Sequence, residues 1–382
     1  MADKIKAVVM TGPGKVETQK LPWPELKPGG LILKMNMAGI CGTDKHAYRG
    51  ESILYGGTEA EQEIVYPGVR GHENVGTIVE IRKEDQDSIE YHGTRLKVGD
   101  RVTMCPNIIC KQCWYCRHVF AFPFCAENTT IGLSFKSTEW PYVAGGWADY
   151  MYVPAGSWVY KIPDEMTDEM AALTELMVVA ATLDRAKEFS RLEARGFGFA
   201  DTVGIQGCGP IGLMHIIKAK MLGAWQIVAI DPSEEKLRLA KEFGATHTIN
   251  VNEVKDPLAA IMEITGGRGR ERTYECAGND ATFDLCMRST MRGHVMTCVS
   301  FYKQPVKAAL DYAVLNGINI MTVRGEGRNN CKRALSLMSQ GKIKTKQILT
   351  HTFPLDDFAT AYDYFVNRKD GAMKVVVLPQ GK

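Results

Sequence analysis

Residues 201–231 read DTVGIQGCGPIGLMHIIKAKMLGAWQIVAID, and this stretch decides the fold of the part of the chain around it. Its pattern predicts a short apolar strand, a glycine turn, a helix that stops at Gly223, and a second strand. The turn carries G-x-G-x-x-G, and Asp231 follows the last of these glycines by 19 residues. A glycine run between a strand and a helix, with an acidic residue at the next strand end, predicts a dinucleotide site. We assign to this site Gly207, Gly209, Pro210, Ile211, Gly212 and Asp231.

The chemistry of this pattern favours NAD over NADP. Turns without side chains let a pyrophosphate approach the backbone, and the start of the helix presents free N–H groups and a partial positive charge. Asp231 is expected to accept hydrogen bonds from the adenosine ribose and to repel a 2′-phosphate. Lys236 and Arg238 would suit a phosphate, but the amphipathic pattern of residues 233–245 places both on a solvated helix face.

Alternating strands and helices continue beyond this stretch. RTYECAG around Glu275 and HVMTCVS around Met296 are both apolar runs bounded by turns, which predicts a doubly wound parallel sheet. His215 and His294 fall inside these elements and are interpreted as structural. Five scattered cysteines among apolar neighbours are interpreted as small core residues: Cys208, Cys276, Cys286, Cys298 and Cys331.

The composition is that of a globular protein. Of 382 residues, 45% are hydrophobic and 24% charged, and the formal net charge is +2 with the two signs interspersed. These values argue against a nucleic-acid partner, and no apolar run is long enough for a membrane span. The first residues lack a secretory signal, so a cytoplasmic location is expected. In a reducing cytosol, eleven cysteines do not indicate a disulfide framework.

Four cysteines are concentrated in CKQCWYCRHVFAFPFC, residues 110–125. Their spacing, C-x2-C-x2-C-x8-C, suits four thiolates around a structural zinc ion, which needs no open position. An iron–sulfur cluster fits less well, because a ferredoxin run has its fourth cysteine after three residues and before a proline. Unliganded cysteines are a further alternative, and Cys105 lies outside the spacing. The predicted ligands are Cys110, Cys113, Cys116 and Cys125.

A second metal site is indicated upstream, where GICGTDKH and GVRGHENVG place Cys41 and His72 on glycine-flanked turns. One thiolate and one imidazole make half of a zinc site that would keep one position open. Asp44 is interpreted as a local turn cap.

The order GICGTD, GHE-x2-G, VGDRV and then the four-cysteine lobe resembles the zinc-dependent medium-chain dehydrogenase/reductase family, over essentially the whole chain. The resemblance implies that Cys41 and His72 bind a catalytic zinc and that Glu73 is a carboxylate able to coordinate it. It gives Glu175, in the apolar segment MAALTELMVVAAT, the place of the third protein ligand. Thr43 would hydrogen-bond the substrate oxygen, and His46 would pass the proton onward through the cofactor ribose to solvent.

The same resemblance implies the substrate class. Polyol and threonine dehydrogenases have glutamate where this chain has Glu175, whereas the typical alcohol dehydrogenases of the family have cysteine. We therefore expect a secondary alcohol of the polyol, sugar-alcohol, cyclitol or amino-alcohol class to be oxidised to a ketone with NAD. The alternatives are a simple alcohol dehydrogenase or aldehyde reductase, a zinc-free reductase and a non-catalytic zinc module. A homodimer or homotetramer is implied.

The expected fold is α/β, in three parts. A GroES-like β-rich catalytic domain with the zinc lobe is predicted for residues 1–165, and an NAD-binding Rossmann domain for 166–325. Residues 326–382 resemble the return segment of the catalytic domain.

Overall fold

The chain forms two compact units. The structure, a computed structural model, describes residues 4–51, 53–54, 61–119, 124–181, 183, 202–302, 305–323, 327–341, 343 and 345–381. Unit 1 comprises Met1–Glu175 with Gly327–Lys382, and unit 2 comprises Leu176–Glu326. The chain therefore leaves the first unit and later returns to it, while the predicted functional domains 1–165, 166–325 and 326–382 remain a proposal.

Unit 2 is built on one parallel sheet, as the sequence predicted. Its order is β15-β14-β13-β16-β17-β18, so the strand that opens the unit is central and the order reverses beside it. This is the 3-2-1-4-5-6 order of the doubly wound fold, in which dinucleotides bind where the order reverses. The strands are β13 (Thr202–Gln206), β14 (Gln226–Asp231), β15 (His247–Asn250), β16 (Arg270–Glu275), β17 (Thr290–Cys298) and β18 (Asn319–Thr322).

Helices pack on this sheet in two groups, α7 with α8 and α9 with α10 and α11. Local signals fix their ends: the Ser233 hydroxyl caps α8 by accepting the N–H of Lys236, and Gly244 ends it. Leu222, just before Gly223, ends the helix of the glycine motif, as predicted. The helices are α7 (Pro210–Met221), α8 (Glu234–Phe243), α9 (Pro257–Ile264), α10 (Asp280–Ser289) and α11 (Leu310–Asn316).

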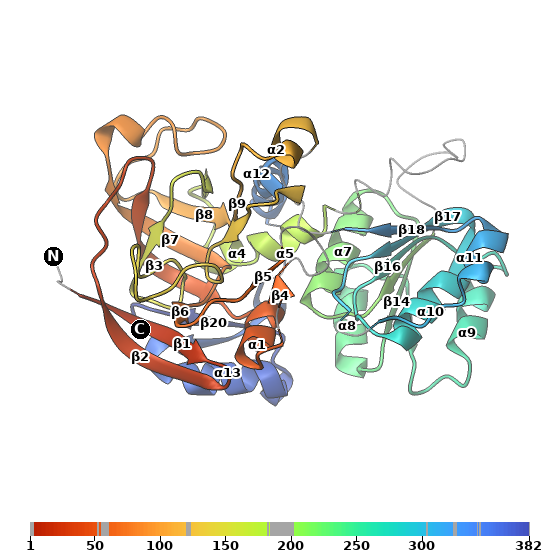
Figure 1. Cartoon of the computed structure of the whole chain (residues 1–382). Helices are drawn as coiled ribbons and strands as arrows, with labels where there is room; N and C mark the ends of the chain where they lie inside the picture. The colour runs from red at the N-terminus through yellow and green to blue at the C-terminus, as the bar shows by residue number, and fades with distance from the viewer. Residues whose placement is uncertain are drawn as a thin grey trace. The chain divides into compact units, whose positions relative to one another are not determined.

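Unit 1 is built on two main sheets. One has the order β2-β1-β6. The other runs β12-β8-β7-β3-β20-β19, with β11 also paired to β3. Figure 1 shows β20 back among the strands from the start of the chain, although it comes after the whole of unit 2. The strands of these sheets are β1 (Lys4–Gly12), β2 (Lys15–Pro22), β3 (Leu31–Gly39), β6 (Gly68–Val69), β7 (Asn74–Ile81), β8 (Arg101–Cys105), β11 (Tyr150–Val153), β12 (Trp158–Lys161), β19 (Leu349–Pro354) and β20 (Lys374–Leu378).

The core of unit 1 lies between its sheets and the C-terminal helix, where Trp147 packs against Phe358 at a ring-centroid distance of 4.3 Å. No helix in the described ranges has the length and apolar character needed to span a bilayer. The shorter strands are β4 (Ile53–Leu54), β5 (Gln62–Glu63), β9 (Asn107–Ile108) and β10 (Thr129–Thr130). The helices are α1 (Gly42–Tyr48), α2 (Trp114–His118), α4 (Asp168–Ala171), α5 (Thr174–Val179), α12 (Gly327–Met338) and α13 (Phe358–Asn367), with short 3-10 turns η1 (Lys83–Asp85), η2 (Thr345–Gln347), η3 (Leu355–Asp357) and η4 (Lys369–Gly371).

Candidate metal centres and nucleotide site

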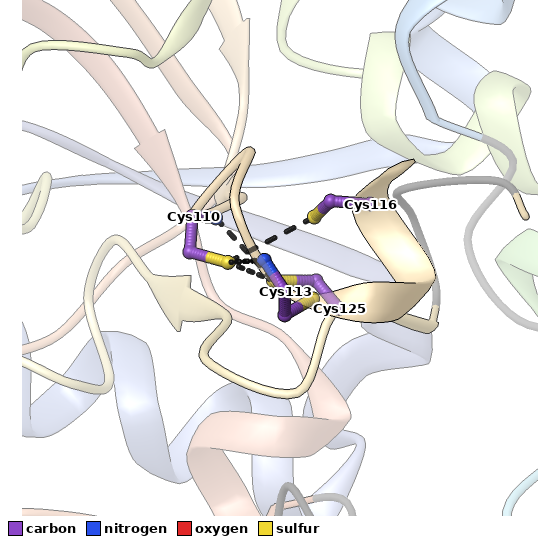
Figure 2. A group of neighbouring side chains, drawn as sticks. All are labelled: Cys110, Cys113, Cys116 and Cys125. Carbon is purple, nitrogen blue, oxygen red and sulfur yellow. Dashed lines mark hydrogen bonds between the residues drawn. The ribbon is translucent and has the colours of Figure 1, made fainter. Parts of the chain in front are cut away.

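The structure brings the four cysteines of the lobe together, with all four sulfurs within 4.8 Å of one another. Figure 2 shows them converging from the two ends of the segment and from α2, of which Cys113 is the N-cap. Cys110 Sγ lies 3.6 Å from Cys125 Sγ and 3.9 Å from Cys116 Sγ. Zinc–sulfur bonds of about 2.3 Å in a tetrahedron require sulfurs about 3.8 Å apart. The lobe therefore has the dimensions of a four-thiolate zinc site.

Electrostatics in the lobe also suit a cation. Hydrogen bonds from the backbone N–H groups of Ala126 and Cys116 lower the pKa of Cys113 to about 6. Burial and the neighbouring sulfurs of Cys113 and Cys125 raise the pKa of Cys116. One sulfur is thus pushed toward the thiolate while its neighbour resists ionisation, because adjacent thiolates repel each other. A divalent cation would remove that conflict and allow all four to ionise.

A second group consists of Cys41, His72 and Glu73, each of which offers a ligand atom within 4.8 Å of the others. Cys41 is the N-cap of α1, while His72 and Glu73 lie just before β7. The turn before His72 requires glycine, since Gly71 has φ +91° and a Cβ there would lie 2.6 Å from Trp147 Cδ1. Buried Glu73 Oε1 has no hydrogen-bond partner. A thiol, an imidazole and a carboxylate form a donor set that fits zinc.

Two charged residues hold this group in place. Asp44 accepts the N–H of Cys41 at 2.8 Å, and its other oxygen lies 3.6 Å from His72 Nδ1. The Asp44 carboxylate thus lies beside the His72 ring, in the place of an outer-shell partner of a metal-binding histidine. Lys374 of β20 forms an ion pair with Glu73 and donates to the Ile40 carbonyl at 3.0 Å. Asp44 is thus a helix cap, as expected, and also a partner of His72.

These partners shift the pKa values in the group. Burial alone would lower the pKa of His72, but the Asp44 carboxylate and the Cys41 sulfur raise it well above its usual value. The concentration of negative groups around an imidazole is the potential that attracts a dication.

Glu175 lies in the first turn of α5 and is half-buried, but it is not part of the group within 4.8 Å. Burial and the nearby Glu73 carboxylate raise its pKa, while His72 and Lys374 act in the opposite direction. Charged residues of the Cys41 group therefore influence the pKa of the Glu175 carboxyl group. Its role as third zinc ligand stays a prediction.

The two residues predicted to handle the substrate proton both lie on α1. Thr43 is half-buried in its first turn. His46 lies one turn later, and its Nδ1 is 3.1 Å from a carboxylate oxygen of Glu51. The N–H of Glu51 donates to the His46 carbonyl at 3.0 Å, so side chain and backbone both connect the two residues.

The glycine motif of unit 2 has the geometry of a nucleotide turn. Gly207 has φ +94° directly after β13, and Pro210 and Ile211 form the first turn of α7. A Cβ on Gly212 would lie 1.9 Å from the Gly207 carbonyl oxygen, so the helix can approach the turn only without a side chain there. Gly209 is the N-cap of α7, and the residues assigned from the sequence thus lie together at the helix start.

Asp231 ends β14 next to this turn. One of its oxygens accepts the N–H of Cys208 at 2.8 Å, and the other accepts the N–H of Ser233 at 2.9 Å. The prediction that Lys236 lies on a solvated face is wrong: its ammonium is 3.7 Å from Asp231 and its side chain is 19% exposed. Helix α8 begins just after Asp231, so its first turn faces the strand end. Arg238 is exposed and pairs with Glu242, as expected.

Four residues of these sites did not follow from the sequence. Lys374 and Glu51 belong to no sequence motif, and Lys374 comes close to Glu73 only in the folded chain. The contacts of Asp44 with His72 and of Lys236 with Asp231 could have been predicted from sequence spacing. Asp44 lies three residues after the proposed ligand Cys41, and Lys236 lies five residues after Asp231, so both side chains are within reach of their sites.

Family models match both halves of the chain. Residues 27–164 match an alcohol dehydrogenase GroES-like domain, and residues 210–340 match a zinc-binding dehydrogenase domain.

Individual proteins match nearly the whole chain. An L-threonine 3-dehydrogenase of Bacillus velezensis is 31% identical over 386 residues, covering 99% of this chain and 100% of that protein. A sorbitol dehydrogenase of Bacillus subtilis is 29% identical and covers 98% of this chain and 97% of its own. The crystal structure of a 2R,3R-butanediol dehydrogenase from Bacillus subtilis superposes with a TM-score of 0.80 at 26% identity, covering 98% of this chain and 99% of that one.

Proposed function

Because the chain belongs to the zinc-dependent medium-chain dehydrogenase/reductase family, we propose that it oxidises a secondary alcohol with an adjacent polar group. The substrate class is a polyol, sugar alcohol, cyclitol or amino alcohol, NAD accepts the hydride, and the product is a ketone. The observation that carries this proposal is the glutamate at position 175, in the first turn of α5, where the family resemblance places the third zinc ligand. The relatives named for threonine and sorbitol support the same class.

Cys41, His72 and Glu175 would hold the catalytic zinc, with Glu73 beside them. When bound, zinc supplies a Lewis acid that lowers the pKa of the substrate hydroxyl, and NAD supplies the hydride acceptor. The lobe cysteines would hold the structural zinc. Lys374 balances the charge of Glu73 through their ion pair, and the Asp44 carboxylate lies beside the His72 ring.

The residues proposed to remove the substrate proton lie on α1. The Thr43 hydroxyl would accept a hydrogen bond from the substrate alcohol, and His46 would carry the proton toward solvent, since its side chain is 24% exposed. Glu51 accepts the hydrogen of Nδ1 and so presents Nε2 as the basic nitrogen. Asp231 would bind the adenosine ribose, and Gly207, Gly209 and Gly212 would admit the pyrophosphate.

A homodimer or homotetramer is supported by the edge of the sheet in unit 2. Among the strands that the structure describes, β18 is at the edge of this sheet, and Val314 and Leu315 of α11, the helix that precedes it in the chain, are 76% and 85% exposed. An edge with unpaired backbone groups and apolar neighbours favours pairing with a second copy. Light scattering should give a mass of two or four chains, and a monomer would contradict this part of the proposal.

We also propose a cytoplasmic location, since thiols that bind a metal must stay reduced.

The proposal is tested by metal content and by substrate-dependent NADH formation. We expect two zinc ions per chain in the wild type and one in Glu175→Ala. The matched control is Glu169→Ala, an exposed carboxylate six residues earlier, which should retain both. Sugar alcohols, cyclitols, vicinal diols and threonine should yield NADH faster than ethanol or propanol.

Two results would overturn the proposal. A preference for simple primary alcohols would favour the alternative, a simple alcohol dehydrogenase. Zinc in the lobe alone, with no turnover of any alcohol, would favour a non-catalytic protein.

A further inference from the structure

The carboxylate of Glu275 joins two loops at the carboxyl edge of the sheet in unit 2. Glu275 ends β16 and is fully buried. Its Oε1 accepts the N–H groups of Ala277 and Gly278, at 2.8 and 2.9 Å. Its Oε2 accepts the phenolic hydrogen of Tyr302, which lies four residues beyond the end of β17. One buried side chain therefore fixes both the loop after β16 and the loop after β17.

Close packing reinforces this connection. A Cβ on Gly278 would lie 3.1 Å from Ser300 Cβ and 3.2 Å from the Phe301 carbonyl oxygen, so the two loops touch directly. The Tyr302 ring packs edge-on against Phe283 of α10, at a ring-centroid distance of 5.9 Å. Burial and the bond to Glu275 raise the pKa of Tyr302, so the phenol keeps its hydrogen and remains a donor.

The same loops contact the nucleotide turn. A Cβ on Gly207 would lie 3.1 Å from Ala277 Cβ, so the loop after β16 packs on the first glycine of the motif. Gln206, Glu275 and Cys298 lie opposite one another in the sheet register, as the last residues of three adjacent strands. The three loops that leave this row follow the strands on one side of the point where the strand order reverses, which in doubly wound sheets borders the ligand crevice.

A dinucleotide spans that crevice, with its pyrophosphate at the glycine turn. Asp231, on the β14 side, receives the adenosine half. The nicotinamide half then comes to the β16 and β17 side. We propose that Glu275 and Tyr302 are a positioning pair for the nicotinamide half of the cofactor, an inference that rests on the NAD assignment above. The pair holds the loops after β16 and β17 in the form that receives the nicotinamide, so that less ordering is needed on binding.

The test compares NADH with ADP-ribose, which lacks only the nicotinamide ring. Affinities of each are measured by titration calorimetry for the wild type, Tyr302→Phe and Tyr312→Phe. Tyr312 is the matched control, because its phenol also donates a hydrogen bond in unit 2, but to the Arg288 carbonyl at the end of α10, at 3.0 Å, and not to Glu275.

Loss of one hydrogen bond should weaken NADH binding to Tyr302→Phe by about three- to tenfold. ADP-ribose should bind Tyr302→Phe within about twofold of the wild type, which also shows that the unit is folded, and Tyr312→Phe should match the wild type for both ligands. Unchanged NADH affinity in Tyr302→Phe would overturn the proposal. Equal weakening of NADH and ADP-ribose would also overturn it, since the pair would then support the unit as a whole. A wild type that binds neither ligand would instead contradict the NAD assignment.

Discussion

Lys374 and Glu73 form an ion pair in which the two side chains are only 3% and 0% exposed. Glu73 directly follows the proposed zinc ligand His72, and Lys374 also donates to the carbonyl of Ile40, the residue before Cys41. Burial disfavours the charged lysine, yet the Glu73 carboxylate and the Cys41 sulfur raise the pKa of Lys374 above its usual value. The last strand of the chain thus supplies the positive charge that the acidic metal group needs.

Replacing one partner of this ion pair should destabilise the protein more than replacing both partners together. Lys374→Met leaves a buried carboxylate without its partner, and we expect a loss of about 3–5 kcal/mol in the free energy of unfolding. Glu73→Gln should have a cost of the same order, and the double variant should lose much less than the sum of the two. Urea unfolding at one fixed zinc concentration measures all four proteins. Strictly additive losses would show that the two charges do not interact.

The four-cysteine lobe is predicted to hold one zinc ion per chain. Cys125→Ser should lose one zinc ion per chain and lower the thermal unfolding midpoint, because metal binding is coupled to folding of the lobe. Cys105→Ser serves as the control, since this buried cysteine lies outside the cluster of four sulfurs. Zinc retained by Cys125→Ser, or lost from Cys105→Ser, would mean that the ligand set is wrong. Acid should release the lobe zinc, because protons compete for the thiolates.

Glu51→Gln tests the proton path. The amide keeps the size of the side chain but removes the charge that orients the His46 ring. We expect kcat to fall several-fold, but less than the roughly hundredfold or more that a proton-transfer residue itself contributes. KM for NAD should be unchanged, since Glu51 is not among the residues proposed to bind the cofactor. The exposed Glu63→Gln is the control, and equal activity of the two variants would exclude a role for Glu51.

His215 predicts a component of acid unfolding. It is fully buried on α7, its Nδ1–H donates to the Ile211 carbonyl, and burial lowers its pKa to about 4. In the unfolded chain its pKa is about 6.5. Between pH 6.5 and 4 the unfolded chain therefore takes up a proton that the folded protein excludes, and stability falls as the pH falls.

One such group contributes a slope of at most about 1.4 kcal/mol per pH unit. His215→Phe should flatten the pH dependence of the free energy of unfolding in this window. The exposed His247→Gln should leave the slope unchanged. A wild-type slope retained in His215→Phe would assign the acid sensitivity to other groups.

Much of the fold could be predicted because the decisive signals are local. The glycine motif, the adjoining strands and Asp231 lie within one short stretch, and each turn residue has a direct steric reason, as Gly212 shows. Cys41 and His72 could be paired because their turns occur in a fixed order with the cysteine lobe. The family models agree with the GroES-like part of the predicted fold and with a zinc-binding dehydrogenase.

What could not be predicted depends on contacts between distant parts of the chain. Lys374 reaches Glu73 because β20 pairs with β3, and no local pattern encodes that pairing. Tyr302 looks like an ordinary loop residue until the sheet brings it to Glu275. Lys236 was misplaced because helix periodicity describes one helix alone and ignores the strand end that its first turn faces.

Strand β20 lies between β3 and β19 in the sheet of unit 1 but follows the strands of unit 2 in sequence, so unit 1 can be completed only after those strands have been synthesised. All six strands of unit 2 lie between Thr202 and Thr322, so this unit emerges whole from the ribosome while unit 1 still lacks its inner strand. Domains tend to fold as units as they emerge. The nucleotide half can therefore fold first, and the metal group receives Lys374 only after β20 has been synthesised.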